Sequence, residues 1–195
     1  MPSIKPVERK YMTTTVEQFL ETNYSGFDST IYRDLSLNLT KLLTDGPLSE
    51  QERFMNLLAI STTLENQDFM KWAAQSLKDL GVEENVIRES TEVAGIMGMN
   101  NVYYKFRGYL PEEVKENYSR AGLRMQSLMK PVTGKANFEM MAMSVSIING
   151  CPVCISTHEK SLTELGVTAD KIHELARMAA VTKGLSTLKK TKLIF

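Results

Sequence analysis

The amino-acid sequence predicts an all-α protein with about nine helices, given typical helix and loop lengths. Three observations support this prediction. Apolar residues recur at helical spacing along most of the chain, glycine and proline fall where helices would end, and β-branched runs are short. A chain of 195 residues is long enough to bury a proper core. We therefore expect a single all-α domain over residues 1–195.

The first well-marked helix begins after Ser49. This serine can cap a helix, and Glu52 stands three residues later, where the acidic partner of a capping box belongs. Within the expected helix, Glu50 to Leu64, apolar residues follow at helical spacing: Phe54, Leu57, Leu58 and Leu64.

Later helix boundaries are marked by glycine and proline. Gly81 and Gly166 each follow a leucine and precede a valine, as helix-terminating glycines do. Pro111 is followed by two glutamates, which places proline at a first helical position and acids in the first turn. Asn149 and Gly150 end another helix, and Pro152 suits the first turn of the next.

An internal repeat organises the chain. The segment 77–82 (LKDLGV) reappears 85 residues later as 162–167 (LTELGV), and the same offset pairs Ser61 with Ser146 and Ile87 with Ile172. Chance similarity between two amphipathic helices is the alternative. Unbroken register favours one helical unit used twice. The first copy covers about 48–110 and the second about 130–195.

Composition excludes some classes of function. Basic and acidic residues balance at 23 each, so the chain lacks the excess positive charge that non-specific nucleic-acid binding requires. No secretory signal is visible at the N-terminus, and the uncharged run from Met140 to Thr157 is too polar to span a bilayer. We expect a cytoplasmic protein that buries this run, part of it between subunits.

The strongest functional signal is a dithiol motif. Both cysteines of the chain, Cys151 and Cys154, lie in a Cys-Pro-Val-Cys sequence, and His158 follows four residues later. At a helix start, unpaired N–H groups and the helix dipole lower a thiol pKa. Spacings of three and four residues place all three side chains on one helix face. The pair can form a reversible disulfide.

Two more residues complete the candidate site. His158 can accept a proton from Cys154, and the carboxylate of Glu139, on the preceding helix, can return to orient the imidazole. In the first copy the positions that match Cys151, Cys154, His158 and Glu139 carry Asn66, Phe69, Ala73 and Phe54. The first copy is therefore expected to be a scaffold with a degenerate site.

Two other interpretations of the cysteines stay open. A zinc site would usually need four ligands, whereas Cys151, Cys154 and His158 supply three, and His173 is expected at the surface or partly buried. The cysteines could also be inert core residues, because free cysteine is often buried.

The constellation resembles a known family. Glu139 followed by the CxxC motif and His158 is similar to the signature of the alkyl hydroperoxidase D (AhpD) branch of the carboxymuconolactone decarboxylase-like superfamily. The stretches 148–151 (INGC) and 97–104 (MGMNNVYY) and the duplicated, half-degenerate layout also resemble that branch. The resemblance covers most of the chain and is weakest before about Leu35.

This resemblance implies a fold, an assembly and a chemistry. Family members are all-α, assemble as trimers or multiples of them, and reduce organic hydroperoxides without metal, haem or flavin. Some pass electrons from a dihydrolipoyl carrier to a peroxiredoxin. Carried over, Cys154 attacks the peroxide, Cys151 resolves it, and Glu139 and His158 relay protons. Val153 departs from members that have a second histidine between the cysteines.

The sequence thus predicts an antioxidant thiol-dependent peroxidase and disulfide reductase. The alternatives are a non-peroxidase member of the same superfamily, such as a lactone decarboxylase, and a non-catalytic helical interaction module. Lactone decarboxylation does not need two thiols, so the CPVC motif favours the peroxidase. An interaction module would leave the thiols inert.

Overall fold

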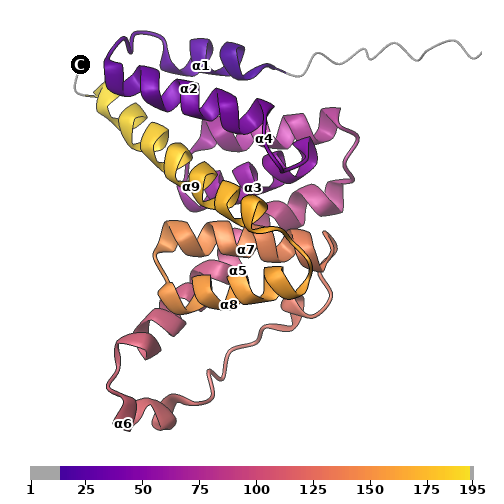
Figure 1. The fold of residues 1–195 in the computed structure, drawn as a ribbon, viewed down its shortest axis with the longest axis vertical. Helices are drawn as coiled ribbons and strands as arrows, with labels where there is room; N and C mark the ends of the chain where they lie inside the picture. The colour runs from indigo at the N-terminus through magenta and orange to yellow at the C-terminus, as the bar shows by residue number, and fades with distance from the viewer. Residues whose placement is uncertain (1–13, 194–195) are drawn as a thin grey trace, which may run out of the picture.

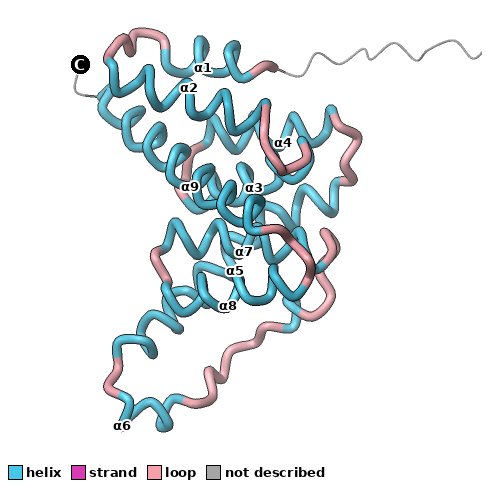
Figure 2. The backbone as a smooth tube through the Cα atoms, in the orientation of Figure 1, coloured by secondary structure: helices cyan, strands magenta, loops and turns pink. Residues whose placement is uncertain are grey.

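The structure is a computed structural model that describes residues 14–193, and over that range it contains nine α-helices, three short 3-10 helices and no strand (Figures 1 and 2). The predicted all-α class is confirmed. The helices are α1 (Val16–Tyr24), α2 (Thr30–Thr44), α3 (Glu50–Thr63), α4 (Gln67–Asp79), α5 (Glu84–Tyr109), α6 (Glu112–Lys115), α7 (Lys135–Asn149), α8 (Pro152–Glu164) and α9 (Ala169–Lys190).

The helix boundaries follow local signals in the sequence. Ser49 caps α3 and forms both hydrogen bonds of the predicted capping box with Glu52. The two predicted glycine stops adopt positive φ angles, 76° at Gly81 and 78° at Gly166. Pro111 differs slightly from its prediction, because it is the N-cap of the four-residue α6 and not its first helical residue.

Helices α3, α4 and α5 begin at residues 50, 67 and 84, and α7, α8 and α9 begin at 135, 152 and 169. Each start in the first set is therefore 85 positions before its counterpart. The turns also correspond: Glu65 and Gly150 have φ angles of 56° and 61°. These boundaries are consistent with the predicted repeat, whose origin in a duplication stays a prediction.

The core lies where α3 and α7 meet. Helix α3 packs against α4, α5, α7 and α9, and α7 packs against α5, α8 and α9. Met140, Met141 and Met143 of α7 are all buried inside the chain. The expected burial of the run from Met140 to Thr157 is confirmed for residues 140–146, but Val153 and Thr157 on the first turns of α8 are exposed, so the prediction was wrong for that part. However, these methionines cannot serve the intersubunit contact that we also expected of the run, because their own subunit already covers them.

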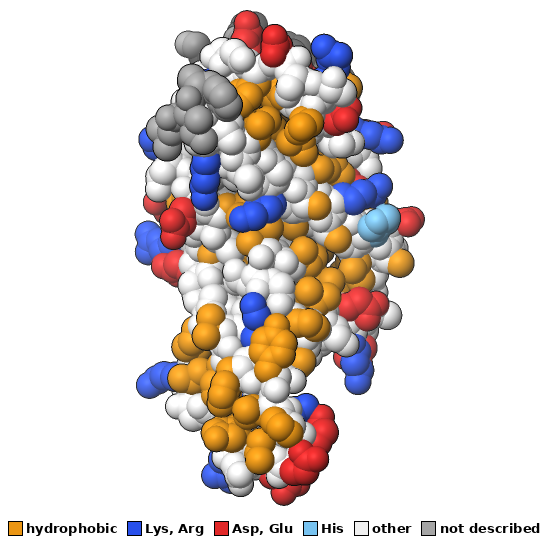
Figure 3. Space-filling view, turned by 90° about the vertical axis from the view of Figure 1, so that its left-hand side faces the viewer, with side chains coloured by type: hydrophobic (Ala, Val, Ile, Leu, Met, Phe, Trp, Pro, Cys, Tyr) orange, Lys and Arg blue, Asp and Glu red, His pale blue; other side chains and the backbone are white. Residues whose placement is uncertain are grey.

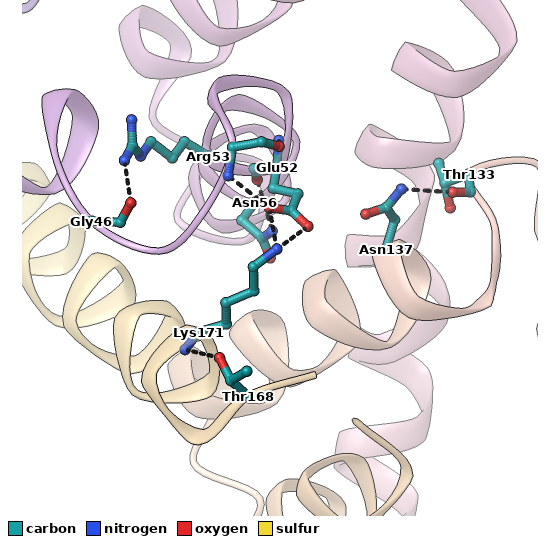
Figure 4. Close-up of polar contacts among 9 residues, drawn as sticks. Gly46, Glu52, Arg53, Asn56, Thr133, Asn137, Thr168 and Lys171 are labelled. Carbon is teal, nitrogen blue, oxygen red and sulfur yellow. Dashed lines mark hydrogen bonds and ion pairs between the residues drawn. The ribbon is translucent and has the colours of Figure 1, made fainter. Parts of the chain in front are cut away.

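Polar contacts fasten the two halves around this core. Lys171 Nζ lies 2.7 and 2.8 Å from the two carboxylate oxygens of Glu52, so the starts of α3 and α9 are held together (Figure 4). Ser144 of α7 donates to Asn56 Oδ1 of α3 at 2.9 Å. The residue that completes the α3 capping box therefore also joins the two halves.

Residues 110–134 form an arm that leaves the helical body after α5 and returns at α7, with α6 at its far end (Figures 1 and 2). Apolar side chains gather on this end of the molecule (Figure 3). The arm also exposes Met129 and Val132 close to α7, whereas five exposed residues belong to α5 and the part of the arm up to residue 123: Val102, Phe106, Tyr109, Tyr118 and Leu123. We call these five residues the α5–arm patch.

In the described part of the chain, no helix is long and apolar enough to cross a membrane.

Candidate active site

The turn between α7 and α8 positions the dithiol. Gly150 closes α7 in the left-handed conformation, Cys151 is the N-cap of α8, and Pro152 is its first residue. The Cys151 N–H donates to the carbonyl of Ser146 at 3.1 Å. The predicted helix start is therefore present, and it places both sulfurs at the positive end of a helix dipole.

Cys151 and Cys154 form a disulfide, with their Cα atoms 5.3 Å apart. The backbone N–H of Cys154 donates to Cys151 Sγ at 3.4 Å, so the N-cap sulfur also receives a bond from the helix. Both residues are buried. Among residues 14–193, no group of three or more His, Cys, Asp or Glu side chains is arranged to hold a metal ion.

Glu139 and His158 meet across the α7–α8 pair. The carboxylate oxygen Oε2 of Glu139 accepts a hydrogen bond from His158 Nδ1 at 2.7 Å. This bond fixes which imidazole nitrogen faces the carboxylate and leaves Nε2 as the nitrogen available for proton transfer. Sequence reasoning anticipated this return of Glu139 from the preceding helix.

Sequence reasoning missed Lys135. Its ammonium lies 2.8 Å from Glu139 Oε1, so the carboxylate has a cationic or N–H partner on each oxygen. Burial opposes the charged form of Glu139, but the bonds from His158 and Lys135 outweigh it and lower the pKa of this carboxyl. Lys135 precedes Glu139 by four helical residues, a spacing that would have indicated the pair.

Cys154 of the dithiol lines a cavity of about 340 Å³, close to the lower limit of small-molecule sites. His158 and Glu139 line the same cavity, whereas Cys151 does not. The apolar remainder comes from α5, α7, α8 and the arm: Met97, Tyr104, Met125, Leu128, Phe138 and Val153. The arm therefore helps to enclose the space beside the disulfide.

Polar side chains of α5 hold the α7–α8 turn in place. Asn101 of α5 donates to Ser146 at 2.9 Å and accepts from the Asn149 side chain at 2.9 Å. Lys105 donates to the Asn149 carbonyl at 3.1 Å. The signal for this network was the stretch 97–104, noted for its family resemblance but not assigned a role.

The matching region of the first copy is packed core. Asn66 caps α4 as Cys151 caps α8 and accepts from Phe69 N–H at 3.3 Å. Phe54, Phe69 and Ala73 are all buried. Apolar side chains thus occupy three of the four positions of the reactive residues, and the polar cap Asn66 occupies the fourth. The role of the first copy as a scaffold stays a prediction. His173 is exposed at the surface, as expected.

Comparison with known proteins identifies similar chains. The carboxymuconolactone decarboxylase family model matches residues 121–193. A protein named alkyl hydroperoxide reductase AhpD from Anaeromyxobacter dehalogenans is 38% identical over 76% of this chain and 79% of its own length. Proteins of the same name from Mycolicibacterium paratuberculosis and Rhodococcus erythropolis are 37% and 35% identical, over 79% of this chain and 85% and 84% of their own lengths.

Proposed function

The chain belongs to the AhpD family, and from this premise we propose that it is a thiol-dependent peroxidase that reduces organic hydroperoxides through Cys151 and Cys154. One observation carries the proposal: Cys154, one half of the disulfide, lines the same cavity as the hydrogen-bonded Glu139–His158 pair. A dithiol supplies the two electrons that a hydroperoxide requires. The pair supplies a nearby acid and base.

In the proposed cycle, the Cys154 thiolate attacks the terminal oxygen of the hydroperoxide. The O–O bond breaks, Cys154 becomes a sulfenic acid, and the departing alkoxide takes a proton from His158 to become an alcohol. The Cys151 thiol then attacks the sulfenic sulfur, which forms the disulfide and releases water. The dithiol is oxidised by two electrons and the peroxide is reduced by two.

The assignment of Cys154 as the nucleophile rests on its position. Cys154 and His158 are four residues apart on α8, and both line the cavity. Cys151 is fully buried at the N-cap in the disulfide form. The rival assignment, with the N-terminal cysteine of CxxC as nucleophile, follows thioredoxin-type logic.

The cavity favours organic hydroperoxides, because apolar side chains from α5, α7, α8 and the arm line it beside the polar reactive residues. We propose that the cycle closes when an external dithiol, such as a dihydrolipoyl group, reduces the disulfide, and that electrons can pass on to a peroxiredoxin. No metal, haem or flavin is required by this chemistry. A reducing compartment, the cytoplasm, would keep such a donor available.

The test is turnover of tert-butyl hydroperoxide with a reduced lipoyl domain, compared with dithiothreitol. We expect faster turnover with the lipoyl domain, and a mass loss of two hydrogens per chain after mild peroxide treatment of the reduced protein. Persistent free thiols, or disulfides only between chains, would contradict the proposed cycle.

Single cysteine variants test the assignment of roles. Peroxide consumption should nearly vanish in Cys154→Ser, whereas in Cys151→Ser a sulfenic-acid probe should label Cys154. His158→Ala should slow the peroxide step by about 100-fold or more, the usual effect of losing acid–base help. The roles are reversed if Cys154→Ser keeps its peroxide rate and Cys151→Ser loses it.

A further inference from the structure

Asn100 is a cavity residue to which the proposed cycle assigns no role. It lies on α5, within the family-like stretch 97–104, and its side chain is only 4% exposed. Its neighbour Asn101 faces the α7–α8 turn, where both its amide nitrogen and its amide oxygen are hydrogen-bonded. Asn100 and Tyr104, four residues apart, instead line the cavity that holds Cys154.

The amide of Asn100 lacks an adequate partner inside the protein. Its Oδ1 is buried and accepts no hydrogen bond. Among the described residues that line the cavity, no other side chain has a buried oxygen or nitrogen without a hydrogen-bond partner. Its Nδ2 has only the sulfur of Met97, at 4.0 Å, a weak acceptor. Turning the amide over would still leave one end unsatisfied.

A buried, unpaired amide is costly and therefore rare in folded proteins. Burial in an apolar wall explains neither its presence nor its position, because a leucine would fill similar space without the cost. A ligand that brings a hydroxyl group into the cavity would satisfy it. The amide is thus suited to a ligand with one polar end on an apolar body.

We propose that Asn100 binds the hydroperoxide group of the substrate. Because its Oδ1 exposes almost no surface before a ligand enters, the amide turns toward the cavity and then accepts the terminal O–H. This inference rests on the proposed peroxidase function. The bond would hold the terminal oxygen in the wall that Cys154 shares, while the organic group lies against the apolar side chains. Asn100 then acts as the polar anchor of the site and Cys154 as its nucleophile.

An amide oxygen suits this step because no proton has to move to it. When the Cys154 thiolate takes the terminal OH, that hydrogen stays on the oxygen, which becomes the OH of the sulfenic acid. The alkoxide that leaves receives its proton from His158. The hydrogen bond to Asn100 can therefore persist from the bound hydroperoxide, through O–O cleavage, to the sulfenic acid.

The test is the second-order rate of peroxide reaction in Asn100→Leu, which keeps the branched shape of the side chain but loses the amide. We expect the rate to fall by about 10-fold, the range of one neutral hydrogen bond. The fall should be equal for tert-butyl hydroperoxide and hydrogen peroxide, because both carry the same terminal O–H. Asn100→Ser retains a hydroxyl and should lose less than Asn100→Leu.

Two readouts separate this role from a structural one. Reduction of the disulfide by dithiothreitol, and alkylation of the reduced dithiol by iodoacetamide, involve no hydroperoxide and should keep their wild-type rates in both variants. Asn137→Leu is a matched control, because Asn137 is a half-buried asparagine outside the cavity that bonds only within its own turn.

The outcomes distinguish this inference from its premise. If the wild-type dithiol does not react with hydroperoxides at all, the proposed function fails and takes the role of Asn100 with it. If the wild type reacts and Asn100→Leu reacts equally fast, the anchor role alone is wrong. If the rates of dithiothreitol reduction and of alkylation also fall in Asn100→Leu, the role of Asn100 is to support the structure of the turn.

Discussion

Glu139 has two nitrogen partners, one on each carboxylate oxygen. His158 binds Oε2 at 2.7 Å and Lys135 lies 2.8 Å from Oε1. A carboxylate held in this way stays ionised in spite of its burial. Lys135 is half-exposed and also lines the cavity, so its ammonium stabilises the carboxylate charge from the edge of the site.

Replacing Lys135 with methionine should shift the pH dependence of peroxide reduction. Losing the ammonium removes one of the partners that lower the pKa of Glu139, so this pKa should rise. The acid limb of the rate profile should then move to higher pH. The measurement is the peroxide rate across pH 4 to 8, with Lys160→Met, which removes an exposed lysine of α8, as the matched control. If the acid limb of the rate profile does not move, Lys135 does not influence the ionisation of Glu139.

The lowered pKa of Glu139 also makes a prediction about stability. A group with a depressed folded-state pKa stabilises the fold above its unfolded pKa, and the contribution is lost as pH falls through the folded value. Glu139→Gln removes this contribution. Urea unfolding should show the variant less stable than wild type at pH 7, with a smaller difference at pH 3. A difference that stays constant with pH would contradict the assignment.

At the scale of elements, the same helix–turn–helix unit is built with different turn residues. The chain reverses in the left-handed conformation at Gly150 before α8 and at Glu65 before α4. Glycine adopts this conformation freely, whereas a side chain there costs about 1–2 kcal/mol. The turn that carries the dithiol is thus the unstrained one, and the strained turn lies in the first copy, which has no reactive residues.

Inverse substitutions at the two turns should change stability in opposite directions. A methyl group on Gly150 would meet no atom within 4 Å, so Gly150→Ala tests backbone conformation alone and should lower the unfolding free energy by about 1 kcal/mol. Glu65→Gly relieves the same strain and should raise the unfolding free energy. The greater entropy that glycine gives the unfolded chain offsets part of this gain. Urea unfolding of both variants provides the measurement, and a shared sign would refute the argument.

At the scale of the whole molecule, the exposed apolar surface is concentrated at one end. The α5–arm patch includes Val102 and Tyr109, whose exposed fractions are 72% and 78%. Side chains of this size seldom gather on the surface of a monomer without a partner. The arm also projects from the helical body, a shape suited to contact with another subunit (Figure 1).

We expect the protein to assemble as a homotrimer or a multiple of one through this end. Sedimentation at micromolar concentration should therefore give a mass well above the 22.0 kDa of one chain. Val102→Glu should dissociate the assembly, because it would bury a charge in the contact. Ile31→Glu is the control, since Ile31 is similarly exposed, at 67%, on α2 outside the patch. A wild-type monomer would exclude the assembly.

Much of the candidate site could be predicted because its determinants are local. Cys151, Cys154 and His158 share one helix start because of a capping position, a proline in the first turn and spacings of three and four residues. None of these signals depends on distant parts of the chain. Glu139 was also predictable, because one tight turn at Gly150 returns α8 along α7 and brings the carboxylate back to the histidine.

The sequence by itself determined the helices, their ends and the reactive face of α8, because each depends on residues within one or two turns of one another. Only the tertiary structure decided the rest. Asn100 and Asn101 are neighbours of the same type, yet packing gives their amides different surroundings. The Asn100 oxygen has no hydrogen-bond partner, whereas the Asn101 amide is hydrogen-bonded to residues of the α7–α8 turn. Packing also placed the methionines of α7 in the core. Such outcomes depend on which helices pack against one another, and that packing is determined by residues far apart in the chain.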